Sequence, residues 1–172
     1  MIIPAKAGVV NGRQYTGNTD GAAPKKRAGM DAFIKEMIWA GQGAIWDNGS
    51  YGIRPMRGSE ALSVHATGRA VDLSYRPSEK RKLANRKEAL ALINKIVPVA
   101  NDLGIEMIID YMPQPFGRAW RCDRQAWQKY TKSTVHGAPS GDWFHIEITP
   151  QAADSPIFVK AAFLKAFGEI HP

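Results

Sequence analysis

The most regular pattern along the chain is a set of apolar residues that recur every three or four positions. This spacing places side chains on one face of an α-helix. In residues 27–42 the apolar face consists of Met30, Phe33, Ile34, Met37 and Ile38. Glycines at positions 41 and 43 follow directly, and glycine commonly ends a helix. The pattern therefore predicts an amphipathic helix over residues 27–42.

Two later segments also predict helices. Ser78 is a suitable N-cap for a long helix whose apolar face carries Leu83, Leu90, Ile93, Val97 and Ala100. Pro98 lies within this segment, and we expect it to kink the helix or to shorten it. The last helix is expected to open at Ser155-Pro156, with proline at its first position, and to end before Gly168.

Shorter apolar stretches with turn residues at their ends predict β-strands. The segments are residues 51–56, 69–75, 105–111 and 142–149. Pro55 would confine the first strand to the edge of a sheet. Between the last two strands, residues 112–141 are rich in turn residues, and we expect loops there with a short helix-like stretch at 121–130.

The length of 172 residues suits one domain with a single core. Residues 1–25 have no sustained periodicity and are expected to form an irregular lead-in to a domain over residues 26–172. Helices alternate with short strands that look antiparallel. The pattern predicts an α+β fold in which helices flank a small antiparallel sheet.

Composition narrows the classes of function. The net charge of +7 favours anionic partners, namely nucleic acid, acidic lipid or acidic cell-wall polymers. One cysteine, Cys122, excludes an intramolecular disulfide. No stretch is long and apolar enough to cross a membrane, so we expect no membrane insertion. The first residues lack a basic start followed by an apolar run, so no secretory signal is expected.

Two short segments carry the residues of a metal site. The first is Ser63-Val64-His65-Ala66-Thr67-Gly68-Arg69-Ala70-Val71-Asp72, and the second is Asp142-Trp143-Phe144-His145-Ile146-Glu147. Catalytic zinc usually takes three protein ligands and leaves one position for water. Two imidazoles and one carboxylate, from His65, Asp72 and His145, meet that need. An isolated histidine would more often be an ordinary loop or core residue. The prediction of a metal site therefore depends on the two motifs taken together.

The spacing around these ligands has physical consequences. Gly68 lets the backbone turn sharply between His65 and the strand that carries Asp72. Glu147 is two residues after His145, so the two share a face of the strand, and Glu147 could steady a ligand imidazole. Asp142 is three residues before His145 and would lie on the opposite face of a regular strand. The residues APSGD predict a turn there, which would let Asp142 approach the metal.

The pattern SxHxxGxAxD, followed by a distant acid-x-x-His, resembles the superfamily of zinc D-Ala-D-Ala carboxypeptidases and L-alanyl-D-glutamate peptidases. The resemblance covers about residues 30–150, although only the two motifs are specific. It implies a hedgehog-like α+β fold, one zinc ion bound by His65, Asp72 and His145, and Asp142 as the general base. It also implies that Arg54 contacts the substrate or the oxyanion. Arg57 is close in the sequence, and the spacing does not decide which of the two arginines has this role.

Many carboxypeptidases and dipeptidases of this group have Glu where this chain has Asp142. The Asp form is similar to phage endolysins that cut between L-Ala and D-Glu of peptidoglycan. The resemblance thus implies a monomeric hydrolase that is made in the host cytoplasm and acts on the bacterial cell wall after release. A D-Ala-D-Ala carboxypeptidase or dipeptidase of the same superfamily remains open as an alternative.

A rival function, without catalysis, is a zinc-stabilised module that binds cell wall or nucleic acid. It rests on a basic run that consists of Arg76, Lys80, Arg81, Lys82, Arg86 and Lys87. Such a run is usually the solvated face of a helix, although it could bind phosphates. Aromatic residues do not interleave with it as a single-strand platform requires. We therefore expect no specific nucleic-acid partner.

Overall fold

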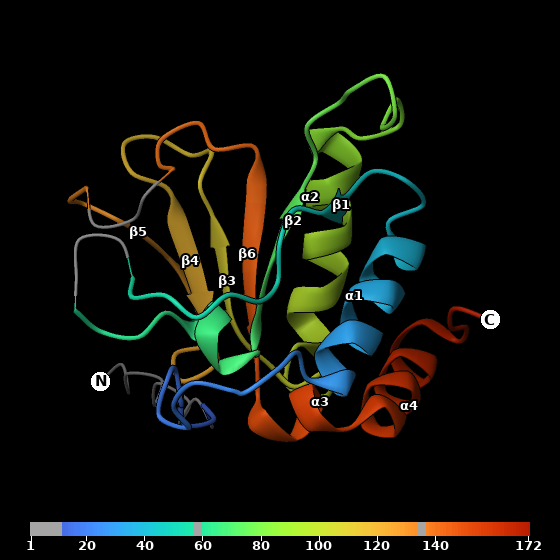
Figure 1. Ribbon diagram of the computed structural model, residues 1–172. Coiled ribbons are helices and arrows are strands. Elements are labelled where there is room, and N and C mark those ends of the chain that lie inside the picture. Colours follow the sequence, from blue (N-terminus) through green and yellow to red (C-terminus); the bar gives the residue numbers. More distant parts are fainter. Residues whose placement is uncertain (1–11, 57–59, 134–136) are drawn as a thin grey trace, which may run out of the picture.

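The computed structural model describes residues 12–56, 60–133 and 137–172. Its centre is a six-stranded sheet in which every neighbouring pair is antiparallel (Figure 1). The spatial order is β1-β2-β6-β3-β4-β5. The strands are β1 (Trp46–Asp47), β2 (Ala70–Ser74), β3 (Ile105–Asp110), β4 (Arg118–Arg121), β5 (Ala126–Lys129) and β6 (Trp143–Ile148).

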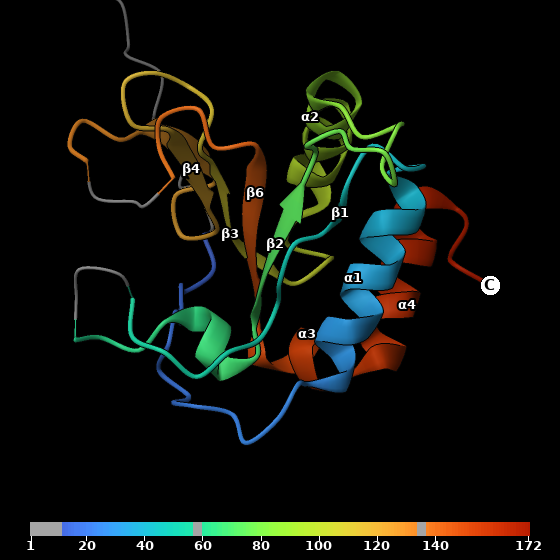
Figure 2. The same ribbon diagram turned by 45° about the horizontal axis from the view of Figure 1, so that its top comes forward.

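The α-helices all lie on one side of this sheet (Figures 1 and 2). In the described part of the chain they are α1 (Ala28–Ala40), α2 (Arg86–Ile96), α3 (Pro150–Asp154) and α4 (Pro156–Phe167). Two short 3-10 helices, η1 (Val64–Thr67) and η2 (Val97–Val99), complete the set. The predicted α+β class is confirmed, with the helices on one face of the sheet. None of these helices has the length and apolarity needed to span a membrane.

Strand alternation separates the core from the opposite face of the sheet. On β6, Phe144 and Ile146 point into the core between sheet and helices, where Phe33 of α1 and Phe163 of α4 meet edge to face with centroids 5.7 Å apart. Because successive side chains of a strand point to opposite faces, His145 and its neighbours two positions away lie on the face without α-helices. The fold thus leaves that face available for polar chemistry.

The second predicted helix begins later than expected. Asn85, rather than Ser78, is its N-cap, because the Asn85 side chain accepts a 2.9 Å hydrogen bond from the backbone N–H of Glu88. The residues before it form turns, and Leu83 is 69% exposed instead of lying on the apolar face. The effect of Pro98 is as predicted, since α2 ends at Ile96 and the chain continues as a 3-10 turn.

Two other local predictions are wrong. Residues 51–56 form no strand, apart from an isolated bridge between Pro55 and Leu62, and β1 takes the sheet edge instead. Residues 121–130 form no helix and instead contain the last residue of β4, the turn after it and the whole of β5, which pairs with β4 as a hairpin. The hairpin pairs Trp120 with Trp127, and the Arg118 guanidinium lies 4.3 Å from the Trp127 ring centroid. Such cross-strand contacts override weak helical periodicity.

Candidate metal centre

The two histidines and the aspartate of the predicted site come from adjoining elements. His65 lies on η1. The N-cap of η1 is Ser63, whose hydroxyl accepts a 3.3 Å hydrogen bond from the His65 backbone N–H. Gly68 ends η1 with φ of 72°, a left-handed conformation that favours glycine. Asp72 follows on β2 and is directly opposite His145 on β6. Opposite residues of paired strands place their side chains on the same face.

The structure brings the three predicted ligands together. One nitrogen or oxygen atom from each of His65, Asp72 and His145 lies within 4.8 Å of the other two. Asp72 Oδ1 is 3.4 Å from His65 Nε2 and 3.0 Å from His145 Nδ1, and the two imidazole centroids are 4.9 Å apart. Both histidines are buried. These residues could therefore hold a metal ion.

Hydrogen bonds on the outer side of each imidazole fix which nitrogen faces the centre. The outer nitrogen of His65, Nδ1, is 3.3 Å from the carbonyl oxygen of Ser50. The outer nitrogen of His145, Nε2, is 3.0 Å from Oε1 of Glu147. A carbonyl or an ionised carboxylate only accepts hydrogen bonds, so the outer nitrogens must donate. In the neutral rings, the inner nitrogens then carry the lone pairs that a metal needs.

Charge balance around the site also fits a divalent cation. The Asp72 and Glu147 carboxylates, with side chains 20% and 5% exposed, contribute two negative charges, and a histidine that binds a metal is neutral. Burial alone would raise the pKa of Asp72, yet its hydrogen bonds with His145 and His65 hold that pKa below its ordinary value. Burial likewise would raise the pKa of Glu147, and contacts with His145, Tyr15 and Arg69 lower it. The donor set of two nitrogens and one oxygen is one that zinc accepts.

A cavity of about 340 Å³ opens beside the three candidate ligands. Its wall includes Glu147 and the cationic side chain of Arg54. The remaining wall combines the aromatic residues Tyr15, Tyr111, Tyr130 and Trp143 with Ser63 and several aliphatic residues. The Tyr111 and Trp143 rings pack with centroids 4.9 Å apart. The site can therefore receive a ligand of several heavy atoms beside a metal.

Asp142 lies in the turn before β6, as the sequence predicts, but its carboxylate is turned to Arg76. The Arg76 guanidinium donates two hydrogen bonds to it, of 2.6 and 2.8 Å, and lowers the pKa of Asp142. The Asp142 backbone is held as well, because its carbonyl accepts bonds from Ser74 Oγ and the Tyr75 N–H. Asp142 is not among the described residues that line the cavity.

Of the two candidate arginines, Arg54 lines the cavity. Arg57 falls outside the described residues. Sequence reasoning missed two residues that contact the site, namely Ser50, through its carbonyl, and Tyr15, through its hydroxyl. Neither carries a local signal, since each reaches the site only through the tertiary fold.

No protein-family model, curated protein or solved structure matches this chain.

His145 makes the stability of the metal-free protein depend on pH. Burial lowers the pKa of His145, but the carboxylates of Asp72 and Glu147 outweigh burial and raise it from 6.5 to about 10. The folded state therefore holds this proton more tightly than the unfolded chain does. The stabilisation is complete below a pH of about 6.5 and is lost as the pH rises toward about 10. We expect the melting temperature of chelator-treated protein to fall across this interval in scanning calorimetry.

The matched control for this pH dependence is His145→Gln, which has no imidazole to titrate at this position. Its melting temperature should fall less between the same two pH values. A wild-type melting temperature that stays level or rises over the interval would contradict the assignment of the proton to His145.

Proposed function

We propose that this chain is a zinc-dependent peptidase that hydrolyses stem peptides of peptidoglycan, of the L-alanyl-D-glutamate endopeptidase type. The observation that carries the proposal is the convergence of His65, Asp72 and His145 at a cavity, with both imidazoles oriented by outer hydrogen bonds. The α+β class and antiparallel sheet support the hedgehog-like fold that the motifs imply. The partner would be cell-wall peptidoglycan, which a monomer reaches after release from the host cytoplasm.

The chemistry follows from what each side chain can do. When bound, zinc supplies a water of lowered pKa and polarises the scissile carbonyl. Asp142 would take the proton of the attacking water and pass it to the leaving amine. Arg54, in the cavity wall, would stabilise the developing oxyanion or bind a substrate carboxylate.

We assign the role of base to Asp142 instead of Glu147, and this role requires the Asp142 carboxylate to turn from Arg76 toward the cavity, which it does not line. Both oxygens of Glu147 are already engaged, Oε1 by His145 and Oε2 by the hydroxyl of Tyr15. Among the described residues, the side chain that binds the Asp142 carboxylate is Arg76, which is 52% exposed, and an exposed ion pair is worth at most about 1 kcal/mol. The Asp142 carboxylate can therefore exchange Arg76 for the attacking water at a small cost in free energy. The lowered pKa of Asp142 keeps the carboxylate ionised before this exchange.

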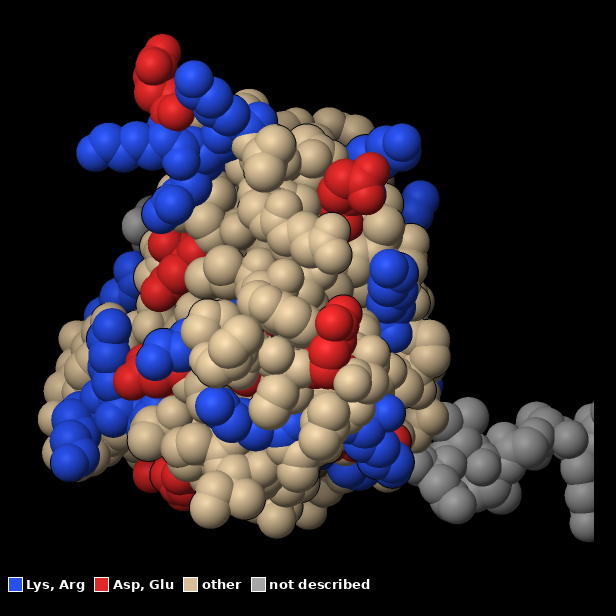
Figure 3. All heavy atoms as spheres, turned by 90° about the vertical axis from the view of Figure 1, so that its right-hand side faces the viewer, with Lys and Arg blue, Asp and Glu red and all other residues tan. Residues whose placement is uncertain are grey.

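The basic run that favours a nucleic-acid module is divided by the fold. Arg76 binds Asp142, and Arg86 donates hydrogen bonds to both carboxylate oxygens of the buried Asp110. Of the other basic residues, Lys80, Arg81 and Lys82 belong to the segment between β2 and α2, and Lys87 belongs to the first turn of α2. Lys and Arg side chains gather at the top of Figure 3, where this segment lies. Charge at this end suits general attraction to anionic wall polymers. This basic surface is therefore as compatible with the proposed peptidase as with a module that only binds.

Digestion of purified peptidoglycan tests the proposal. We expect zinc-loaded protein to create new L-Ala C-termini and D-Glu N-termini, read by mass spectrometry. Asp142→Asn should lower kcat by roughly 10²- to 10⁴-fold, which is the usual contribution of a general base. The matched control is Asp123→Asn, because Asp123 also accepts two hydrogen bonds from one arginine, Arg121, away from the cavity.

Each other outcome changes the assignment. Release of D-Ala would make the protein a D-Ala-D-Ala carboxypeptidase or dipeptidase. Equal activity losses in the Asp142 and Asp123 variants would remove Asp142 from the mechanism. Intact wall of several types, despite one bound zinc per chain, would contradict the peptidase and favour the binding module.

A further inference from the structure

An irregular segment near the N-terminus, residues 13–20, packs onto the domain beside the candidate metal centre. We call it the N-terminal strap. It contains no helix or strand and is held mainly by side chains. At one end Arg13 donates hydrogen bonds to Asn101 and to the carbonyl of Ile105. At the other end Asn18 donates a 2.6 Å bond to the carbonyl of Leu62.

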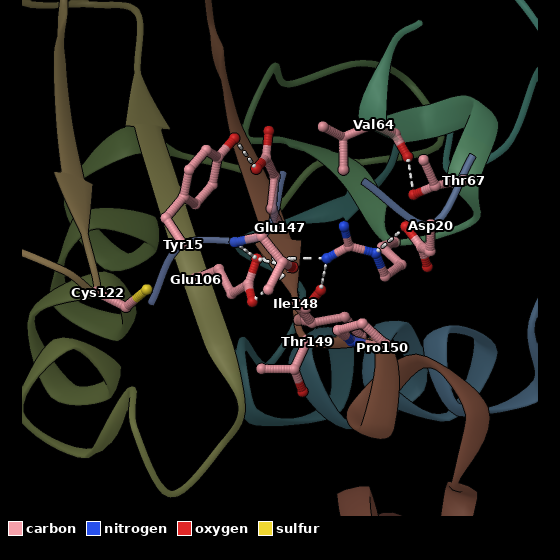
Figure 4. A network of polar contacts seen from close by, with 12 residues as sticks. Tyr15, Asp20, Val64, Thr67, Glu106, Cys122, Glu147, Ile148, Thr149 and Pro150 are labelled. Atoms are coloured by element: carbon pink, nitrogen blue, oxygen red, sulfur yellow. Dashed lines mark hydrogen bonds and ion pairs between the residues drawn. The ribbon is translucent and has the colours of Figure 1, made fainter. Parts of the chain in front are cut away.

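The middle of the strap reaches the metal centre through Tyr15. The Tyr15 hydroxyl donates a 2.7 Å hydrogen bond to Oε2 of Glu147, and Oε1 of the same carboxylate accepts the 3.0 Å bond from His145 Nε2. Figure 4 shows the Tyr15 phenol directed at the Glu147 carboxylate on β6. The chain of contacts from strap to candidate ligand is therefore Tyr15, Glu147 and His145.

We propose that Tyr15 is a positioning residue of the metal centre, which acts by holding Glu147 so that His145 presents Nδ1 to the metal. A carboxylate with one partner on each oxygen cannot rotate without breaking a bond. Loss of the Tyr15 hydroxyl would free Oε2 and let Glu147 turn away from the imidazole. Loss of a hydrogen-bond partner of a metal-binding histidine usually weakens metal binding by about 10- to 100-fold.

Other contacts hold the strap independently of Tyr15. Thr16 Oγ1 donates to the buried carboxylate of Glu106 at 2.9 Å, and Asp20 accepts a 3.0 Å bond from Nε of Arg69. Arg69 also lies 3.3 Å from Glu106, so these residues form one network beneath the strap (Figure 4). The strap should therefore stay docked in Tyr15→Phe, and Thr16→Val can test docking without touching Glu147.

The inference rests on the metal site of the proposed function and not on the substrate. The experiment therefore measures metal binding to the full chain, by competition with a chromophoric chelator for Zn²⁺. The visible spectrum of the Co²⁺-substituted protein is a second readout. We expect Tyr15→Phe to weaken Zn²⁺ binding about 10-fold and to alter the Co²⁺ spectrum. Thr16→Val should lower the melting temperature, while its Zn²⁺ affinity stays within about twofold of wild type.

A double-substitution cycle with Glu147→Gln identifies the route of the effect. If Tyr15 acts through Glu147, Tyr15→Phe should have little further effect on affinity in the Glu147→Gln background. Full additivity, an unchanged affinity in Tyr15→Phe, or an equal loss in Thr16→Val would each overturn the proposal. So would wild-type protein that binds no Zn²⁺. Tight binding without peptide cleavage would leave this inference standing and remove only the proposed peptidase.

Discussion

Asp72→Asn is expected to weaken Zn²⁺ binding roughly a thousandfold and to remove peptidase activity at ordinary zinc concentrations. A zinc ion lies about 2 Å from a carboxylate ligand. At that separation a unit charge and a dication attract by about 17 kcal/mol, even with an effective dielectric constant of about 20. Desolvation of both charges removes part of this attraction. About 4 kcal/mol of net loss corresponds to the thousandfold change.

Asp72→Asn keeps the shape of the side chain, so the measurement isolates the charge. Competition with a chelator gives the dissociation constant, and cleavage of peptidoglycan with added zinc gives the activity. Asp47→Asn is the matched control, since Asp47 is an exposed residue of β1, on the strand next to Asp72. An Asp72→Asn protein that binds Zn²⁺ as tightly as the Asp47→Asn protein would refute the assigned site.

The candidate ligands of this site could be predicted because each stands in a short and regular local pattern. Gly68 sets the turn between His65 and Asp72, and strand alternation puts His145 and Glu147 on one face. The pairing of Asp72 opposite His145 then follows once β2 and β6 are neighbours. Spacing along the sequence therefore places each candidate ligand on its own element, whereas the contact between Asp72 and His145, 73 residues apart, depends on the pairing of the two strands.

The orientation of Asp142 could not be predicted in the same way. Its position in a turn follows from the residues APSGD, but the direction of its carboxylate depends on Arg76, 66 residues away in sequence. Tyr15 is further still, 132 residues from Glu147. Such contacts depend on the packing of the whole domain, and no local pattern encodes them.

The same distinction explains the errors in secondary structure. Ser78 and Asn85 are both good N-caps by residue type, and only Asn85 is followed by a segment that packs its apolar face, with Leu92 and Ile93 buried. The stretch 121–130 has weak helical periodicity, which the cross-strand pairing of β4 with β5 overrides. Where two local solutions have similar energies, tertiary contacts decide between them.

The second large effect is on stability, and it concerns the network beneath the strap. Arg69 has 0% exposure and lies 3.3 Å from Glu106, which is 1% exposed. Its Nη1 also donates a 2.8 Å bond to the carbonyl of Ile148. Nη2 is buried and has no partner among the residues that the structure describes. Arg69 therefore neutralises a buried acid, with one of its own donors left unsatisfied.

Arg69→Met is expected to lower the free energy of unfolding by about 3–5 kcal/mol, because it leaves the charge of Glu106 buried without its cation. Chemical unfolding in urea gives the value. The matched control is Arg121→Met, which breaks the more exposed pair with Asp123 and should cost no more than about 1 kcal/mol.

Glu106→Gln in the Arg69→Met background separates the cost of the stranded charge from the loss of packing. Glutamine can still accept the hydrogen bond from Thr16, which now contacts the carboxylate, and it carries no charge to strand. Replacement of both members of a buried ion pair is often close to neutral for stability. Removal of Arg69 also removes its buried Nη2, which has no hydrogen-bond partner among the described residues. The double variant should therefore regain most of the lost stability. If it is no more stable than Arg69→Met alone, the role of Arg69 is to fill space and not to neutralise Glu106.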